Sequence, residues 1–197
     1  MKKAVLASII FLVFASASFG EILIDNFADN NYTKNPVWWT FGNLNLQVTK
    51  DSTLSVVGKA SDWYVGGIGT YIAGDGRDFA TVNYLTMDVI GNGPDSGTLK
   101  VQLYDDDNGN WQVEQDKNFQ SMYDDRFEAE LKVDWKGLKK VSIPLSEFKD
   151  TNPNVGDNIL NPGKINSSGG LLQMQIIAVA SSKTGAVNLQ IGNILFK

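Results

Sequence analysis

The chain has 197 residues, a formal net charge of −5, no cysteine and no histidine. Without cysteine it forms no disulfides, and without histidine it lacks the commonest general base and the commonest transition-metal ligand. The mild acidity, with lysine and arginine scattered along the sequence, makes nucleic acid and anionic membrane surfaces poor candidates for a partner.

The first 20 residues have the pattern of a secretory signal peptide. Lys2 and Lys3 precede an apolar run over residues 4–14, and small residues follow as far as Gly20. The apolar run is shorter than the roughly 20 residues that a membrane-spanning helix needs. We expect cleavage after Gly20, although Ala17 also fits, and one domain over residues 21–197. The protein would then be secreted, periplasmic or held at the cell surface, without membrane insertion.

Short runs of β-branched, aromatic and aliphatic residues recur between clusters of Gly, Asn, Asp and Pro, which is typical of an all-β sandwich. Asn108-Gly109 predicts a tight hairpin turn, and the polar stretch 150–170 predicts an extended surface loop. The predicted strands cover residues 22–27, 38–48, 54–57, 63–72, 82–90, 99–104, 111–115, 127–132, 139–144, 171–179 and 187–196.

Three of these predicted strands alternate between an apolar and a polar set of side chains, which point to opposite faces of a strand. The apolar sets are Leu85, Met87 and Val89, then Leu99, Val101 and Leu103, then Leu172, Met174 and Ile176. The opposite sets are Tyr84, Thr86 and Asp88, then Lys100, Gln102 and Tyr104, then Gln173 and Gln175. If the three strands are neighbours in one sheet, their polar faces form one surface of amides, carboxylates and aromatic rings.

Such a surface suits sugars, because hydroxyl groups bond to planar amides and carboxylates while the C–H face of a pyranose packs on an aromatic ring. The solvent-facing side of any antiparallel sheet is also polar, however, so the composition of this face alone favours neither interpretation strongly.

Several stretches resemble the family 11 carbohydrate-binding modules, which belong to a wider group of galactose-binding-like jelly rolls that includes the complex I intermediate-associated protein 30 type. The resemblance spans almost all of the predicted mature chain, and its motifs are largely structural. They are Ile-Asp-Asn-Phe at 24–27, the Gly-rich strand 62–71, residues 78–91, Gln-Leu-Tyr-Asp at 102–105, residues 135–148 and residues 191–196.

The resemblance implies an antiparallel two-sheet β-sandwich, a jelly roll, whose concave sheet forms a cleft for one β-glucan-like chain. In the family, tyrosines, carboxylates and an arginine line this cleft. Tyr104 and Asp105 match the family closely enough to take over a role, whereas the family's histidine contact has no counterpart in this chain. The candidate ligand-binding residues are Tyr104, Asp105, Gln102, Asp88, Thr86, Tyr84, Gln173, Gln175, Trp111 and Arg126.

The resemblance also implies a possible structural calcium ion held by the first and last strands. Asp25, Asn26 and Asp29 could supply ligands, although Asn193 stands where the family usually has an acidic residue. The acidic run 105–109 does not fit the spacing of an EF-hand loop, and we expect it to be a solvated hairpin tip.

An enzyme is not expected, because the carboxylates lie in predicted turns or on exposed strand faces and no histidine can activate a nucleophile. The leading hypothesis is an exported, non-catalytic module that binds a polysaccharide or cell-surface glycan. The alternative is a structural or adhesive subunit of a surface layer or filament, with possible self-association. The pairs Trp38-Trp39 and Trp63-Tyr64 would form a stacking platform or a protein contact if exposed, but we expect most of them in the core.

Overall fold

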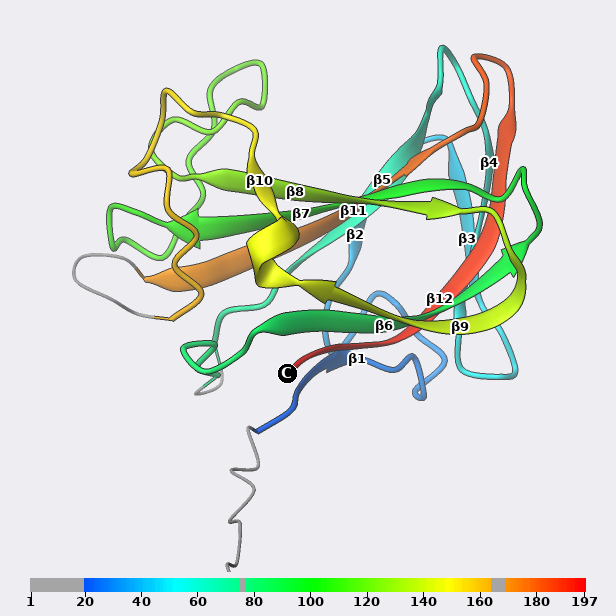
Figure 1. Cartoon of the computed structure of the whole chain (residues 1–197), viewed down its shortest axis with the longest axis horizontal. Coiled ribbons are helices and arrows are strands. Elements are labelled where there is room, and N and C mark those ends of the chain that lie inside the picture. The colour runs from blue at the N-terminus through cyan, green and yellow to red at the C-terminus, as the bar shows by residue number, and fades with distance from the viewer. Residues whose placement is uncertain (1–19, 75–76, 164–168) are drawn as a thin grey trace, which may run out of the picture.

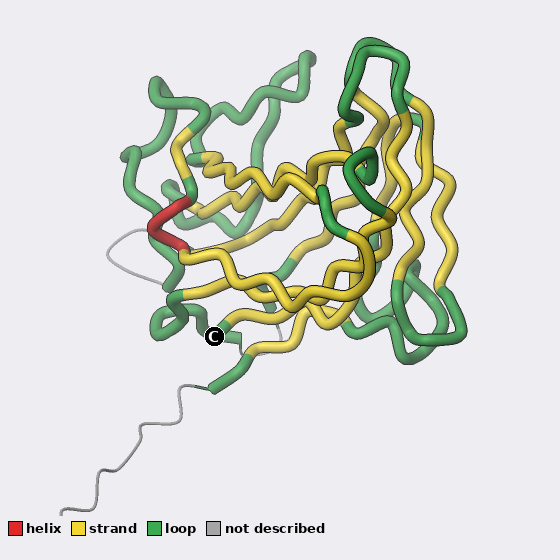
Figure 2. Tube along the Cα trace, turned by 45° about the vertical axis from the view of Figure 1, so that its right-hand side comes forward, coloured by secondary structure: helices red, strands yellow, loops and turns green. Residues whose placement is uncertain are grey.

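The computed structural model describes residues 20–74, 77–163 and 169–197. The predicted signal peptide, apart from Gly20, lies outside the described residues. Two antiparallel sheets pack face to face, and loops gather at the two ends of the sandwich (Figures 1 and 2). The described residues contain no helix of the length and apolar character that a membrane span requires. The predicted all-β sandwich is confirmed.

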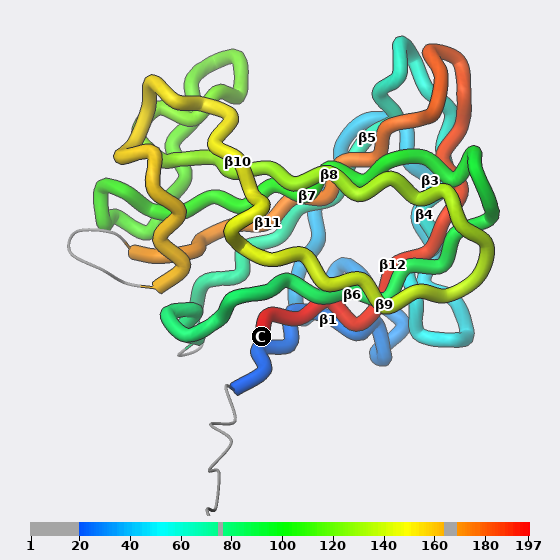
Figure 3. The backbone as a smooth tube through the Cα atoms, in the orientation of Figure 1, coloured from blue at the N-terminus to red at the C-terminus, as the bar shows by residue number. Residues whose placement is uncertain are grey.

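We name the sheets after one central strand of each. The β6 sheet has the order β3 (Leu44–Val48), β4 (Leu54–Lys59), β12 (Ala186–Phe196), β6 (Tyr84–Asn92) and β9 (Lys136–Pro144), with β1 (Ile22–Asp25) also paired to β12. The β7 sheet has the order β10 (Lys149–Asp150), β8 (Arg126–Val133), β7 (Gly97–Asp106), β11 (Gly170–Val179), β5 (Tyr64–Tyr71) and β2 (Trp39–Gly42). One 3₁₀ turn, Leu145–Glu147, follows β9. Figure 3 shows β1 and the C-terminal strand β12 side by side.

The core fills the space between the sheets with the apolar sets that alternation predicted. Leu99, Val101 and Leu103 on β7 are fully buried, and Met174 and Ile176 on β11 are nearly so. The apolar set of β6 meets them from the other sheet. Because these side chains point inward, the polar set of each strand points out of the sandwich.

The condition that β6, β7 and β11 are neighbours in one sheet is not met. β7 and β11 pair with each other, but β6 lies in the other sheet between β12 and β9. Tyr84, Thr86 and Asp88 therefore lie on the opposite outer surface from Gln102 and Tyr104. Alternation reveals which residues of one strand share a face, but it does not reveal which sheet that strand joins.

The predicted run 38–48 is divided between the two sheets at Gly42 and Asn43. β2 pairs with β5, whereas β3 pairs with β4. Gly42 has a φ of 77°, and a Cβ there would lie 2.5 Å from the Cα of Gly66. A glycine is needed at this point because the two backbones approach so closely.

The predicted strand 111–115 is not a strand. β7 pairs instead with β8, and a long loop over residues 107–125 joins the two. Gly109, with a φ of 73°, lies in a bend of this loop, so the predicted tight hairpin turn at 108–109 is wrong. The stretch 150–170 contains β10 and then a surface loop, of which residues 164–168 lie outside the described part.

A buried hydrogen bond joins the first strand to the start of β2. Trp38 is 2% exposed, and its indole Nε1 donates to Oδ2 of Asp25 at 2.8 Å. The other carboxylate oxygen of Asp25 accepts the backbone N–H of Phe27 at 2.7 Å. Asp25 therefore fixes both the end of β1 and the position of Trp38.

Trp38→Phe should lower the free energy of unfolding by about 1–3 kcal/mol, because it leaves a buried oxygen of Asp25 without its donor. Urea unfolding followed by far-ultraviolet circular dichroism measures this change. The substitution should cost less in an Asp25→Ala background, since the bond is already lost there. Equal costs in the two backgrounds would show that the bond does not contribute.

Candidate functional site

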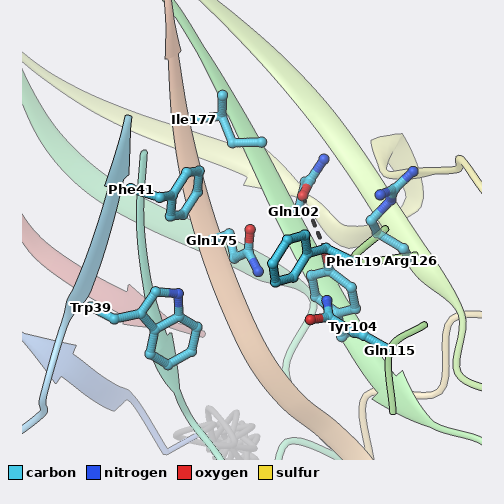
Figure 4. A pocket seen from close by; sticks show the side chains of 9 residues that line it. All are labelled: Trp39, Phe41, Gln102, Tyr104, Gln115, Phe119, Arg126, Gln175 and Ile177. Atoms are coloured by element: carbon cyan, nitrogen blue, oxygen red, sulfur yellow. Dashed lines mark hydrogen bonds between the residues drawn. The ribbon is translucent and has the colours of Figure 1, made fainter. Parts of the chain in front are cut away.

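A pocket of about 510 Å³ lies on the outer face of the β7 sheet, and loop residues add to one rim (Figure 4). Its volume is within the range of small-molecule sites. The lining residues are Trp39, Phe41, Gln102, Tyr104, Gln115, Phe119, Arg126, Gln175 and Ile177.

Two aromatic rings on β2 form one side of the pocket. Trp39 and Phe41 lie opposite Gly69 and Gly67 of β5. A Cβ on Gly69 would lie 2.5 Å from the indole ring of Trp39, and one on Gly67 would collide with the ring of Phe41. The rings therefore lie directly on the bare backbone of β5. The ring of Tyr71 stands 5.4 Å from that of Trp39 and extends this aromatic surface.

Polar side chains of β7, β8 and β11 form the other side. Gln102 lies opposite Gln175, and Tyr104 lies opposite Arg126. All four alternate with core residues, so they share the outward face of the sheet. Their amides and guanidinium group can bond to hydroxyl oxygens and hydrogens.

A short hydrogen-bonded chain holds this polar side in place. Glu128 accepts the side-chain amide of Gln102 and the ammonium group of Lys100, each at 2.8 Å. The hydroxyl of Tyr104 donates to Oε1 of Gln102 at 3.3 Å. Arg126 donates from Nε to Oγ1 of Thr151 at 2.9 Å. Gln102 is thus oriented by its neighbours before any ligand arrives.

Tyr104 lies at the bottom of the pocket and is not an open platform. It is 3% exposed, and burial raises the pKa of its hydroxyl while the nearby Arg126 opposes that rise. Trp39, Phe41 and the fully protruding Phe119, which is 78% exposed, offer more ring surface.

The structure brings together four of the sequence-predicted ligand residues, Gln102, Tyr104, Gln175 and Arg126. The remaining candidates lie elsewhere. Gln173 shares the outward face of β11 but is buried beside Tyr104 without lining the pocket. Tyr84, Thr86 and Asp88 are on the β6 sheet, Trp111 lies in the 107–125 loop beside a separate small pocket, and Asp105 is buried on the inner side of β7.

The pocket also contains Phe41, Gln115, Phe119 and Ile177, which the sequence analysis did not single out, and Trp39, which it considered as a stacking platform but did not include among the candidate ligand residues. For Trp39 and Phe41, a signal was present in the Gly-rich strand, because glycines in a strand mark a place where another group approaches the backbone. Phe119 and Gln115 come from an irregular loop, whose path follows no periodic pattern. Ile177 continues the alternation of Gln173 and Gln175 on β11, but as an apolar residue it does not belong to the polar set that the sequence indicates.

The acidic run after Tyr104 is not a solvated hairpin tip. Asp105 and Asp106 are fully buried, as are Asp124 and Asp125 at the far end of the same loop. Asp105, Asp107 and Asp125 converge so closely that one carboxylate oxygen of each lies within 4.8 Å of the others.

The residues predicted to hold calcium at the first strand are engaged otherwise. Both oxygens of Asp25 accept hydrogen bonds, as described above. Asn26 and Asp29 accept the backbone N–H groups of Ala28 and Asn31 at 3.1 and 2.9 Å. These contacts order the turn after β1 and give no support to a metal site there.

No protein-family model matches the chain, and none of the curated proteins matches it. Solved structures do match. The family 11 carbohydrate-binding module from Clostridium thermocellum in complex with a β-1,3-1,4-mixed-linked tetrasaccharide aligns with a TM-score of 0.55 at 14% identity, covering 91% of this chain and 96% of that one. The family 30 module of a cellulosomal cellulase from Clostridium thermocellum aligns with a TM-score of 0.51 at 12% identity, covering 91% and 98%. The chain has the fold of these carbohydrate-binding modules, as the resemblance in its sequence predicted.

Proposed function

We propose that this protein is a non-catalytic module that binds a polysaccharide chain in the pocket on the β7 sheet. The observation that carries the proposal is the pairing of two aromatic rings on one side of the pocket with oriented amides and a guanidinium group on the other. The structurally similar proteins named above are carbohydrate-binding modules, which supports the same conclusion.

The aromatic side suits the apolar face of a pyranose. Trp39 and Phe41 each present a ring held against the flat backbone of β5, so little side-chain freedom is lost when a sugar packs on them. We therefore assign the stacking role to the two rings of β2, whereas Tyr104, 3% exposed, contributes to the floor of the pocket.

The polar side suits the hydroxyl groups at the edge of the same sugar. Gln102, Gln175 and Arg126 offer donors and acceptors; the Glu128 carboxylate sets the direction of the Gln102 amide, and Thr151 holds the guanidinium group of Arg126. Binding groups that are positioned in advance lose less entropy on association.

The lining also favours binding over hydrolysis. Glycoside hydrolysis needs two carboxyl groups that flank the scissile bond. Among the described residues, no Asp or Glu lines this pocket, and the nearby Glu128 is already bonded to Lys100 and Gln102.

For the ligand we propose a β-glucan. The family 11 module with a similar fold was solved with a β-1,3-1,4-mixed-linked tetrasaccharide, and the pocket here is lined by residues of four strands, β2, β11, β7 and β8, across which a chain would lie. For the location we propose export with cleavage after Gly20, on the pattern of the first 20 residues. Amino-terminal sequencing of the secreted protein should then give Glu21 as the first residue.

Trp39→Ala should weaken binding to a mixed-linkage β-glucan by about tenfold or more, because an aromatic anchor of the pocket is lost. Calorimetric titration of the purified protein with β-glucan, xyloglucan, xylan and mannan measures this and ranks the ligands. Tyr84→Ala is the matched control, since Tyr84 is an aromatic residue, 45% exposed, on the other sheet. A loss on Tyr84→Ala with none on Trp39→Ala would overturn the assignment of the site. If no polysaccharide binds and the protein self-associates, the alternative of a structural or adhesive subunit replaces this proposal.

Gly69→Val should reduce glucan affinity by a similar factor, roughly tenfold, although residue 69 itself need not touch the sugar. The added side chain would occupy the place of the Trp39 indole and lift it from the sheet. In a Trp39→Ala background the same change should cause no further loss in the titration. An additional loss there would mean that Gly69 acts by some route other than the indole.

A further inference from the structure

Three carboxylates converge on the inner side of the β7 sheet, away from the sugar pocket. Asp105 comes from the end of β7, Asp107 from the loop that follows, and Asp125 from the residue before β8. The loop after β10 lies beside them, since its residues Asn158 and Asn161 donate backbone hydrogen bonds to Asp125 and Asp105. We call these three residues the acidic triad.

Each member of the triad accepts a hydrogen bond from a backbone N–H group. Oδ2 of Asp105 accepts from Asn161 at 2.7 Å, and Oδ2 of Asp125 accepts from Asn158 at 2.6 Å. Oδ2 of Asp107 accepts from the N–H of Asp125 at 2.9 Å. The backbone therefore fixes the orientation of all three carboxylates.

The second oxygen of each carboxylate is buried and has no partner among the described residues. These atoms are Oδ1 of Asp105, Asp107 and Asp125. Asp105 and Asp125 are 0% exposed, so water does not reach their side chains freely. An unpartnered buried carboxylate oxygen is costly, and three of them side by side are an arrangement that needs an explanation.

The pKa values of the triad also indicate that its buried negative charges are unfavourable without a cation. Burial, and after it the repulsion of neighbouring carboxylates, raises the pKa of Asp105 to about 8 and that of Asp125 to about 7. Within residues 20–74, 77–163 and 169–197, no lysine or arginine forms an ion pair with the triad. The repulsion among the three groups is thus not offset by a positive side chain.

Gly156 keeps the space beside the triad open. It has a φ of 68°, and a Cβ at this position would collide with carboxylate oxygens of Asp107 and Asp125. The backbone of the loop thus covers the triad without filling it.

Asp106, a buried acid of the same run, has both carboxylate oxygens hydrogen-bonded, as expected for a structural role. It is also 0% exposed, but its oxygens accept the backbone N–H groups of Gly109, Asn110 and Trp111 at 2.8, 3.2 and 2.8 Å. Its carboxylate is not part of the converging group. The unpartnered oxygens of the triad are therefore not a general property of the acidic run.

We propose that the acidic triad binds a divalent cation, preferably calcium. The cation would link the C-terminal end of β7 and the N-terminal end of β8 to the loop after β10. Several carboxylate oxygens around one point are the ligands that calcium prefers, whereas magnesium usually takes one or two carboxylates and keeps its waters. Transition metals favour histidine and cysteine, which the chain lacks. This site differs from the one predicted at Asp25, Asn26 and Asp29.

The experiment measures cation binding without any sugar, so its outcome is independent of the proposed function. Purified protein is freed of metal with a chelator and titrated calorimetrically with calcium chloride, and separately with magnesium chloride. Thermal unfolding is followed in both salts. We expect saturation at one calcium per chain and a melting temperature that rises with calcium concentration, with a weaker response to magnesium.

Asp107→Asn removes one charge at the most accessible member of the triad and is the first variant, with Asp125→Asn as the second. Each should weaken calcium binding by about a hundredfold or more, since the charge count of the ligands sets affinity. Without calcium, each should melt at the same temperature as the unaltered protein or higher, because repulsion within the triad is relieved. This combination separates a lost ligand from a damaged fold.

Asp106→Asn is the matched control, a buried acid in the same run. It should melt at a lower temperature with and without calcium, yet bind calcium within about twofold of the unaltered protein. The proposal is overturned if the unaltered protein shows no saturable heat and no thermal shift up to roughly 10 mM calcium, above the weakest class of protein calcium sites. It is equally overturned if both triad variants keep the full calcium response.

Discussion

The register of β7 against its two neighbours determines which side chains face the pocket. Tyr104 lies opposite Arg126 on β8 and Gln173 on β11, while Gln102 lies opposite Gln175. A slip of one residue would turn every outward side chain of β7 into the core and every core side chain outward. The apolar set of β7, fully buried between the sheets, opposes such a slip, so the hydrophobic core also fixes the geometry of the polar surface.

The same alternation continues past the end of the apolar set. After Leu103, the next residue on the inner side of β7 is Asp105, so the inner face changes from aliphatic to acidic at the edge of the sandwich. Apolar burial holds the sheets together along most of the strand. At the end of the strand the contacts are polar instead, because backbone N–H groups of the loop after β10 donate hydrogen bonds to Asp105 and Asp125. A bound cation would supply the attraction that aliphatic packing provides elsewhere.

Much of the fold was predictable from the sequence because strands carry a two-residue period. The core sets of β6, β7 and β11, the placing of most strands and the sandwich itself all follow from local alternation and turn residues. The division of residues 38–48 between two sheets did not follow, because it depends on the close approach of Gly42 to Gly66, a contact between segments distant in the sequence.

The site was predictable only in part, for a similar reason. Gln102, Tyr104, Gln175 and Arg126 lie on strands whose outward faces alternation identifies. Trp39 and Phe41 could be assigned only once β2 was paired to the glycines of β5, and Phe119 belongs to a loop without a regular pattern. The sequence predicts Asp105 at a solvated tip because acidic residues are usually exposed, whereas the loop after β10, distant in the sequence, packs against it.

Trp38 and Trp39 are neighbours in the chain, but Trp38 points into the core and Trp39 points to the outer face of the β7 sheet. The first is anchored in the interior by Asp25 and by its backbone N–H bond to the carbonyl of Tyr32 at 2.9 Å, and the second is displayed at the surface. The contacts that hold Trp38 do not involve the side chain of Trp39. The anchor preserves where the displayed residue stands, while the displayed residue is free to change its chemistry. Replacing the Trp39 ring would change the surface of the β7 sheet while leaving in place the hydrogen bonds that hold Trp38.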